Sequence, residues 1–352
     1  MLVPPARPVG GRRTERKENE TMLRAMDSAV AGLKAHQNKM DVVGHNIANV
    51  NTFGFKAQTY TFKEAMYQTS TSSTKGTSTA GGSNAAQFGY GTLMGTIGMD
   101  MTASTPSYVG GLNASINGEG FFLTCATKPA DATVEFSKGI MDWDYTRVGQ
   151  FSIDSEGYMV DGNGNFVYGY NPDQFETDGS LKADAKLCPL RISGKVKEVT
   201  ITTGTAGQQL TSKKFVVDYA DTGNALKATN VSINKLGEIT ATITEEVNGK
   251  EVSHPGTSLG KVAIVTFQNP EGVTKGGETY YKASDSDNTG RADSNVAGGD
   301  VPELMAGYIE ASNVDLAKEF ADMITTHRGF QANSKMITVS DEMLSDLVAM
   351  KR

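Results

Sequence analysis

The stretch MDSAVAGLKAHQNKMDVVGHNIANV, residues 26–50, decides the fold of the N-terminal part of the chain. Apolar residues recur in it every seven positions, and a second set follows three positions after each: Met26, Leu33, Met40 and Ile47, then Ala29, His36, Val43 and Val50. This spacing places both sets on one face of an α-helix. We expect a long helix that ends near residues 51–54, where asparagine and glycine favour a stop.

The C-terminal end of the chain carries the same pattern. Its seven-residue stripe consists of Ile309, Leu316, Met323, Phe330, Ile337 and Leu344, with Phe320 and His327 at intermediate positions. Ser312 and Asp315 have the spacing of a capping box, so we expect a helix from Ser312 or Asn313 to about Met350. A single helix cannot bury such a stripe, so both helices are expected to pair with each other or with other copies of the chain.

Between the two helical regions the sequence alternates in short runs that are bounded by glycine, asparagine and aspartate. DGNG at 161–164 and LGE at 236–238 are typical of β-hairpin turns. The segments 67–84 and 284–300 are rich in serine, threonine, glycine or aspartate. The predicted fold class is α+β, mainly β, with long terminal helices that pair as a coiled-coil-like core and antiparallel β domains between them.

The predicted domain organisation has five parts. Residues 1–21 are an expected disordered extension, after which Met22 is a candidate start. The other four parts are a helical polymerisation core at 22–60 and 305–352, extended linkers at 61–110 and 284–304, an inner β domain at 111–170 and 260–283, and an outer β domain at 171–259.

Composition narrows the functional classes. The 352 residues carry a net charge of −7, which argues against a nucleic-acid partner. No apolar run predicts membrane insertion, and no cleaved signal peptide is recognisable. Cys125 and Cys188 are expected to be unpaired thiols, at least one of them buried, rather than a disulfide.

Candidate catalytic and metal-binding patterns are weak. The four histidines, His36, His45, His254 and His327, form no metal or triad motif. The sequences DGNGN (161–165) and DSDNTG (285–290) resemble calcium loops, but Pro172 and Val296 stand where the bidentate glutamate belongs. We therefore predict no enzyme, no cofactor and no metal. A secreted enzyme or binding module with borrowed terminal helices stays open, and a pocket within 171–259 would favour it.

Two motifs at opposite ends of the chain resemble one protein family. NIANVNTFGFK (46–56) and IEASNVDLAKEFADMITTHRGFQANSKMITVSDEML (309–344) are similar to the terminal segments of the bacterial flagellar rod and hook proteins. INGEGFF (116–122), YTRVGQFSIDSEGYMVDGNGNFVYGY (145–170) and VTFQNPEGVTKGGETYYKAS (265–284) resemble the β domain of that family. The motif residues are Asn46, Asn49, Thr52, Gly54, Phe55, Lys56, Asn313 and Asp315.

The resemblance implies a structural subunit that polymerises with copies of itself into a hollow helical tube. The implied polymer-core residues are Met26, Leu33, Met40, Val43, Ile47, Leu316, Phe320, Met323, Phe330, Ile337 and Leu344. Within the family a hook subunit is favoured, forming a curved universal joint that transmits motor torque to the filament. A distal rod subunit of the basal body is the alternative.

The resemblance also implies partners and a location. The implied partners are the hook-cap scaffold, the distal rod, the hook–filament junction proteins and the flagellar type III export apparatus. The implied location is the extracellular hook or basal body of the flagellum, reached without a cleaved signal peptide.

Overall fold

The computed structural model describes residues 11–77, 81–127, 133–137, 142–175, 181–182, 184–192, 195–203, 210–218, 227–247, 250–298 and 301–350. The chain forms two compact units. Unit 1 consists of Met1–Val50, Gln58–Met99 and Val314–Arg352, and unit 2 consists of Asn51–Ala57 and Asp100–Asn313. Each unit therefore combines segments that are far apart in the sequence.

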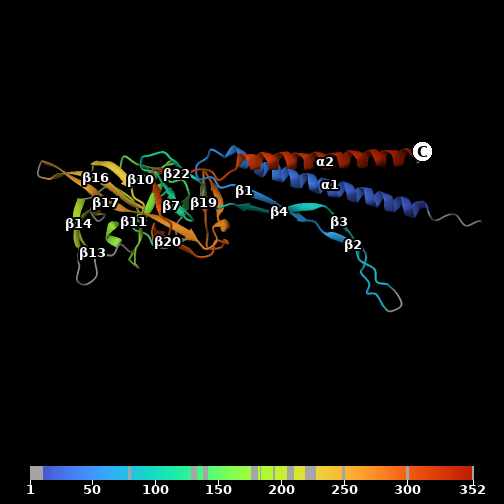
Figure 1. Cartoon of the computed structure of the whole chain (residues 1–352), viewed down its shortest axis with the longest axis horizontal. Coiled ribbons are helices and arrows are strands. Elements are labelled where there is room, and N and C mark those ends of the chain that lie inside the picture. The colour runs from blue at the N-terminus through green and yellow to red at the C-terminus, as the bar shows by residue number, and fades with distance from the viewer. Residues whose placement is uncertain are drawn as a thin grey trace, which may run out of the picture. The chain divides into compact units, whose positions relative to one another are not determined.

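Unit 1 contains two long antiparallel helices, α1 (Gly11–Ala48) and α2 (Leu316–Met350), which lie side by side in Figure 1. Small and polar residues meet at their seam. A Cβ atom on Gly329 of α2 would lie 2.6 Å from the ring of His36 on α1, and one on Gly32 would lie 2.8 Å from Asn333. Glycine at these positions permits the close approach of the two helices.

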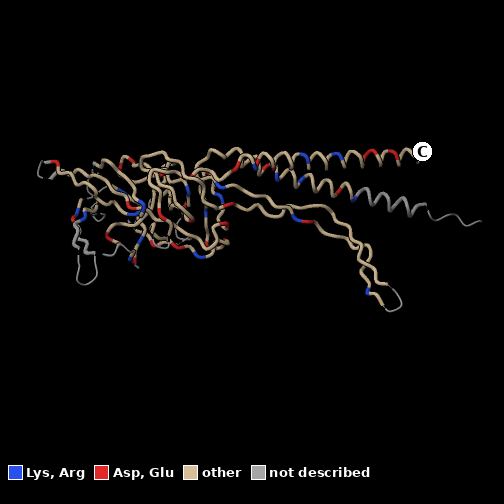
Figure 2. The backbone as a smooth tube through the Cα atoms, in the orientation of Figure 1, with Lys and Arg blue, Asp and Glu red and all other residues tan. Residues whose placement is uncertain are grey.

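A long β-hairpin arm completes unit 1. Strand β1 (Gln58–Glu64) pairs with β4 (Thr92–Met99), and β2 (Tyr67–Thr71) pairs with β3 (Ala86–Gly89), all antiparallel. The arm runs back along α1, because Phe62 of β1 contacts His36 at 5.3 Å between ring centroids and Arg24 lies over Phe88 of β3. Figure 2 shows few charged residues along the arm.

Unit 2 is built on strands and two short 3₁₀ helices. Their bounds are β5 Pro106–Tyr108, β6 Ala114–Ile116, β7 Phe121–Cys125, β8 Asp144–Thr146, β9 Phe151–Ile153, β10 Met159–Asp161, β11 Phe166–Tyr170, η1 Pro172–Gln174, β12 Leu187–Pro189, β13 Lys195–Thr203, β14 Leu210–Asp218, β15 Lys227–Ile233, β16 Glu238–Val247, β17 Lys250–Phe267, η2 Pro270–Gly272, β18 Thr274–Gly277, β19 Tyr280–Lys282, β20 Ala292–Val296, β21 Leu304–Ala306 and β22 Tyr308–Glu310. The pairings are antiparallel except for the parallel contact of β14 with β17.

Strand β17 organises the main sheet of unit 2. It spans 18 residues and pairs with β7, β11, β14, β16 and β20. Its residues Val262 and Ile264 are fully buried, as are Phe122 of β7 and Val167 of β11. Burial of an apolar side chain of this size contributes about 1.5–3 kcal/mol, so the core along β17 stabilises unit 2.

The predicted fold class is confirmed: the protein has terminal helices that pair, with mainly antiparallel β structure between them. Both predicted hairpin turns are present. Gly164 (φ +87°) lies between β10 and β11, and Gly237 (φ +71°) lies between β15 and β16. Glycine adopts this left-handed conformation without steric cost.

The helix boundaries differ from those predicted. Helix α1 begins at Gly11, inside the segment 1–21 that was predicted to be disordered, and residues 1–10 lie outside the described residues. The sequence places opposite charges four residues apart at 16, 20 and 24, a spacing that supports a helix.

The start of α2 was predicted too early. Asp315 caps the helix, because its Oδ1 accepts hydrogen bonds from the backbone N–H groups of Ala317 (2.9 Å) and Lys318 (3.3 Å). The backbone oxygen of Ser312 instead accepts from the Ser104 hydroxyl, so Ser312 belongs to the preceding extended segment.

The segment 171–259, predicted as an outer β domain, lies in the same compact unit as the predicted inner domain. Leu190, Ile239 and Leu259 from this segment belong to one core cluster with Phe122 and Ile264. The physical reason is the length of β17, which continues from one predicted domain into the other. The predicted linkers also carry strands, namely β2–β5 and the last part of β1 in 61–110, and β20 in 284–304.

The two cysteines are free and buried, as the sequence predicted for at least one of them. They lie on opposite edges of β11, because Cys125 is the β-partner of Phe166 and Cys188 is the β-partner of Gly169. Strands two apart in a sheet are about 10 Å from each other, beyond the reach of a disulfide. Burial raises the pKa of the Cys188 thiol to about 12.

We predict that a thiol reagent such as Ellman's reagent modifies neither cysteine in the native chain at pH 8, and modifies both after denaturation in guanidinium chloride. The reactive species is the thiolate, which burial suppresses at Cys188 and shields from reagent at both positions. Absorbance at 412 nm measures the released thionitrobenzoate. Rapid modification of the folded chain would contradict the burial of the thiols.

Candidate functional site

Asn46 of the N-terminal motif ties three elements of unit 1 together. It is 1% exposed, and its side-chain nitrogen donates to the backbone oxygen of Gln58 on β1 (2.8 Å) and to Oε1 of Glu319 on α2 (3.0 Å). Its side-chain oxygen accepts from the N–H of Gln58 (2.9 Å). Burial raises the pKa of Glu319. One asparagine thus fixes the end of α1 against both the arm and α2.

The motif continues into unit 2 as a tight turn. The N–H of Phe55 donates to the oxygen of Thr52, and Gly54 has φ +68°. A Cβ atom on Gly54 would lie 2.7 Å from the side chain of Val148, so both conformation and space require glycine here. The N–H of Gly54 donates to the backbone oxygen of Glu310 (2.8 Å), which brings the two family motifs together.

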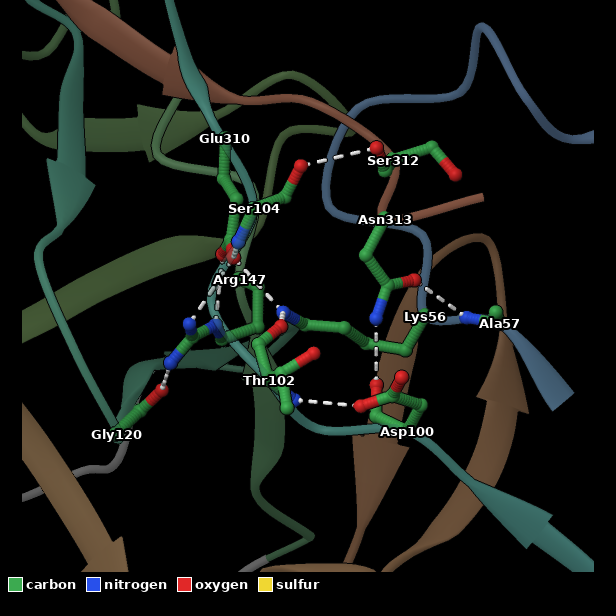
Figure 3. Close-up of polar contacts among 10 residues, drawn as sticks. All are labelled: Lys56, Ala57, Asp100, Thr102, Ser104, Gly120, Arg147, Glu310, Ser312 and Asn313. Carbon is green, nitrogen blue, oxygen red and sulfur yellow. Dashed lines mark hydrogen bonds and ion pairs between the residues drawn. The ribbon is translucent and has the colours of Figure 1, made fainter. Parts of the chain in front are cut away.

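A buried charge cluster lies next to this turn (Figure 3). The carboxylate of Glu310 accepts from Lys56 Nζ (2.8 Å), Arg147 Nε (2.8 Å) and Arg147 Nη2 (3.1 Å), and from the N–H of Ser104 (3.1 Å). The side chains of Glu310, Lys56 and Arg147 are at most 2% exposed. Each charge is therefore out of water, and both cations depend on the carboxylate of Glu310.

Each cation also donates to one backbone oxygen. Lys56 Nζ donates to the backbone oxygen of Thr102 (2.6 Å), and Arg147 Nη1 donates to that of Gly120 (2.6 Å). Three charges in one dry site are tolerated only when hydrogen bonds satisfy most of their donors and acceptors, as they do here.

Burial and charge act in opposite directions on these groups. Burial disfavours the charged form of Glu310, but the hydrogen bonds and the charge of Arg147, with Lys56, outweigh it and lower the pKa of this carboxyl. Burial lowers the pKa of Lys56, and the charge of Arg147 lowers it further, against the attraction of Glu310. The cluster contains two cations and one carboxylate, so loss of the Glu310 carboxylate would leave both cations buried without a counter-charge.

Asn313 of the C-terminal motif joins chain segments at the edge of unit 2. Its Oδ1 accepts from the N–H of Ala57 (2.7 Å), and its Nδ2 donates to the backbone oxygen of Asp100 (2.9 Å). The N–H of Asp100 in turn donates to the oxygen of Ala57 (2.9 Å). Residues 57, 100 and 313 are places where the chain leaves unit 2, so Asn313 holds three of these exits together.

The residues predicted for a polymer core differ in exposure. On α1, Val43 is buried and Met26, Leu33, Met40 and Ile47 are half-buried. On α2, Leu316 and Phe320 are exposed, whereas Met323, Phe330, Ile337 and Leu344 are half-buried. The buried side chains of α2 are instead polar, namely Glu319, Thr326 and Ser340.

Helix α2 presents apolar residues to solvent. Phe320 is 50% exposed and Ile324 is 62% exposed, and with Leu316 they are spaced four residues apart, which places them on one face. A second exposed set, Met336, Met343 and Met350, has seven-residue spacing. Contiguous exposed apolar patches are typical of surfaces that contact other molecules.

The sequence motifs include Lys56 and Asn313 but not Arg147, Glu310 or Glu319. Glu310 follows the apolar pair Tyr308 and Ile309, and Arg147 follows the strand β8 residues. A charged residue that directly follows an apolar pair is the signal that could have identified Glu310, since such residues are seldom buried without a partner. Strand β8 before Arg147 has the mixed sequence DYT and gives no such signal.

The described residues lack a cluster of side chains suited to binding a metal. Among them, no group of three His, Cys, Asp or Glu side chains could hold a metal ion, and no helix is long and apolar enough to cross a membrane. The apolar cavity that Leu190, Val231, Ile239 and Leu259 help to line measures about 10 Å³, the space of one water. A polar hollow of about 320 Å³ lies outside 171–259, beside Asp161, Glu278 and Tyr280.

Two regions of the chain match described families. Residues 26–56 match "Flagella basal body rod protein", and residues 305–350 match "Flagellar basal body rod FlgEFG protein C-terminal". Both regions include residues of the contacts described above: Asn46 and Lys56 in the first, Glu310 and Asn313 in the second.

Similar proteins extend over nearly the whole chain. The flagellar basal-body rod protein FlgG of Bacillus subtilis is 34% identical over 94% of this chain and 100% of the relative. The flagellar hook protein FlgE of Borreliella burgdorferi is 25% identical over the same shares. The crystal structure of Helicobacter pylori flagellar hook protein FlgE2 covers 60% of this chain and 100% of that chain, at 10% identity and a TM-score of 0.31.

The paired terminal helices, the β unit between them and these relatives define an axial protein of the bacterial flagellum. The chain belongs to the flagellar rod and hook protein family. It is a structural subunit that polymerises into the flagellar axis, and its family consists of structural proteins rather than known enzymes.

We predict that Glu310→Gln lowers the unfolding free energy of unit 2 by about 3–5 kcal/mol at pH 7, because it leaves Lys56 and Arg147 buried without a carboxylate. The pKa of Glu310 is lowered in the folded chain, so its contribution is present above the unfolded value near 4.5 and is lost as the pH falls below it. The variant should therefore lose part of the acid dependence of stability.

Urea unfolding of the full chain between pH 3 and pH 7 measures both effects. Glu303→Gln is the matched control, since Glu303 is an exposed carboxylate seven residues earlier and should change stability by less than about 0.5 kcal/mol. Equal effects of the two substitutions would show that burial of Glu310 is not what stabilises the unit.

Proposed function

We propose that the chain is the subunit of the flagellar hook, a curved tube that transmits motor torque to the filament. The supporting observation is that hook proteins align with nearly the whole chain, including the segment 171–259, whose strands extend the sheet of unit 2. Relatives named hook protein FlgE, from Borreliella burgdorferi and Treponema pallidum, align with 94% of the chain. The distal rod is the second candidate, favoured by the 34% identity with FlgG of Bacillus subtilis.

In this proposal the terminal helices form the polymer core and unit 2 faces outward. The support lies in the distribution of apolar residues on α2, where the seam with α1 uses small and polar residues and the larger Phe320 and Ile324 remain exposed. Each such side chain gains about 1.5–3 kcal/mol on burial, so helices from neighbouring copies would be held by these faces.

The proposed partners follow from the same position in the flagellum. The subunit would add beneath a hook-cap scaffold, contact the distal rod at one end of the hook and the hook–filament junction proteins at the other, and leave the cell through the type III export apparatus. The part of unit 2 with strands β13–β16 is rich in threonine, serine and lysine, a polar composition suited to contacts that slide as the hook bends.

Deletion of the gene, followed by electron microscopy of isolated basal bodies, distinguishes the two candidates. A hook subunit predicts complete rods without hooks, whereas a distal rod subunit predicts truncated rods. Polymers of the purified protein provide a second readout, with curved tubes expected for a hook and straight ones for a rod. Truncated rods together with straight polymers would contradict the hook assignment and show that the chain is a distal rod subunit.

We predict that Phe320→Asp abolishes polymerisation and motility while the thermal transition of unit 2 stays unchanged. The substitution removes about 2–3 kcal/mol of burial per contact and places a carboxylate in an apolar interface. Phe320 is half-exposed in the single chain, so little intramolecular packing is lost. Pelleting of polymers and differential scanning calorimetry measure the two effects.

Arg328→Asp is the control, because it introduces the same carboxylate at an exposed polar position of α2. Its polymers should form at near-normal yield. Normal polymerisation of Phe320→Asp would mean that this face of α2 stays in solvent, and the proposed polymer core would have to exclude it.

A further inference from the structure

Two Asn–Gly pairs lie in bends of unit 2, namely 117–118 after β6 and 163–164 between β10 and β11. An asparagine that precedes glycine can lose its side-chain amide without an enzyme, because glycine has no side chain to shield its backbone nitrogen. A third pair, 248–249, lies outside the described residues. Asn117 and Asn163 are both exposed, so access of water does not distinguish them.

Hydrogen bonds hold Asn163 on both sides of the bond that would have to form. Its N–H donates to Asp161 Oδ1 (2.9 Å), and its Nδ2 donates to the Tyr280 hydroxyl (2.9 Å). That hydroxyl is itself fixed, because it donates to Asp161 Oδ2 (2.5 Å). The N–H of Gly164, whose nitrogen would be the nucleophile, donates to the backbone oxygen of Asp161 (3.2 Å). Cyclisation at Asn163 therefore requires these hydrogen bonds to open first.

Asn117 has no such restraint on its side chain. Its backbone N–H donates to the oxygen of Glu303 (3.1 Å), which holds the main chain only. Among the described residues, no group forms a hydrogen bond with the Asn117 side chain or with the N–H of Gly118. The Gly118 nitrogen and the Asn117 amide carbon are therefore free to approach each other, as cyclisation requires.

The bend itself requires glycine at position 118. Gly118 has φ +148°, and a Cβ atom there would lie 2.6 Å from Cγ of Pro302. Both the backbone conformation and the available space therefore exclude a larger residue, which would shield the nitrogen and slow the reaction. The reactive pair follows from how the chain turns between β6 and β7.

We propose that Asn117 is a site of spontaneous deamidation, and that the fold protects Asn163 from the same reaction. The Gly118 nitrogen loses its proton to hydroxide and attacks Cγ of Asn117. The Cγ–Nδ2 bond breaks, and the amide nitrogen takes a proton from water and leaves as ammonia. Water then opens the succinimide ring at either carbonyl, which gives aspartate or isoaspartate. The net reaction consumes water and releases ammonia, with no oxidation or reduction.

The products change the end of a strand pair. Each adds a negative charge two residues before Glu119, and the isoaspartate form lengthens the main chain by a carbon atom between β6 and β7. Residue 117 directly follows the pairing of Ile116 with Leu304, and its N–H extends this ladder to the Glu303 oxygen. The modification therefore alters the backbone where β6 and β21 meet. The proposal is the same for a hook and for a rod subunit.

Peptide mapping by mass spectrometry of the full chain, incubated at pH 8 and sampled over time, tests this site. In the folded chain Asn117 should deamidate at least about tenfold faster than Asn163, because Asn163 reacts only after its hydrogen bonds open. In guanidinium chloride the two rates should converge, since the unfolded chain restrains neither asparagine. Equal rates in the folded chain, or the same ratio of rates in both states, would overturn the proposal.

Tyr280→Phe tests the protection of Asn163. It removes the hydroxyl that holds Asn163 Nδ2, so deamidation at 163 should become about threefold faster or more, with Asn117 unchanged. Tyr108→Phe is the matched control, because it removes an exposed hydroxyl and should change neither rate. An unchanged rate at 163 in Tyr280→Phe, or equal acceleration at both asparagines, would overturn the role of the hydroxyl. If Tyr280→Phe does not fold, the comparison within the unchanged chain still decides whether the fold selects Asn117.

Discussion

A single buried carboxylate, Glu310, is the constraint on which much of unit 2 depends. It forms ion pairs with Lys56, at the N-terminal edge of the unit, and with Arg147, which follows strand β8. A buried charge without a partner costs several kcal/mol, so these three positions must come together for the chain to fold as it does. The two family motifs, more than 250 residues apart, meet at this point for an electrostatic reason.

The helices of unit 1 follow a different physical logic. Gly32 and Gly329 allow the two helices to approach closely, and the hydrogen bond between Asn46 and Glu319 fixes their alignment. Large apolar residues such as Phe320 and Ile324 are left outside the seam. A subunit of a polymer needs exposed apolar residues of this kind, because apolar surface that is buried within one chain cannot bind neighbouring copies.

The β region shows why a single core limits how a subunit can deform. The segment 171–259 shares its apolar core with residues on both sides of it in sequence, through the long strand β17. Close-packed cores resist relative motion of their parts, so unit 2 responds to load as one body.

The sequence by itself determined the parts of the protein that depend on local periodicity and turn chemistry. The seven-residue stripes from Met26 and Leu316 predicted both helices, and glycine at 164 and 237 predicted both hairpin turns. These features arise from neighbours within a few residues, so pattern alone reveals them. The family motifs, including Lys56 and Asn313, were likewise readable from the chain.

Tertiary structure alone decided which distant residues meet. The partners of Lys56, at positions 147 and 310, have no local signature that pairs them, because ion pairs across strands depend on how the sheet is assembled. The joining of 171–259 to the inner sheet also has no local signature, because it depends on the length of β17. The same is true of the small-residue seam between α1 and α2, where His36 meets Gly329. Periodicity shows that one face of a helix is apolar. Whether this face packs against its own chain or against another copy depends on the shape of the folded neighbours.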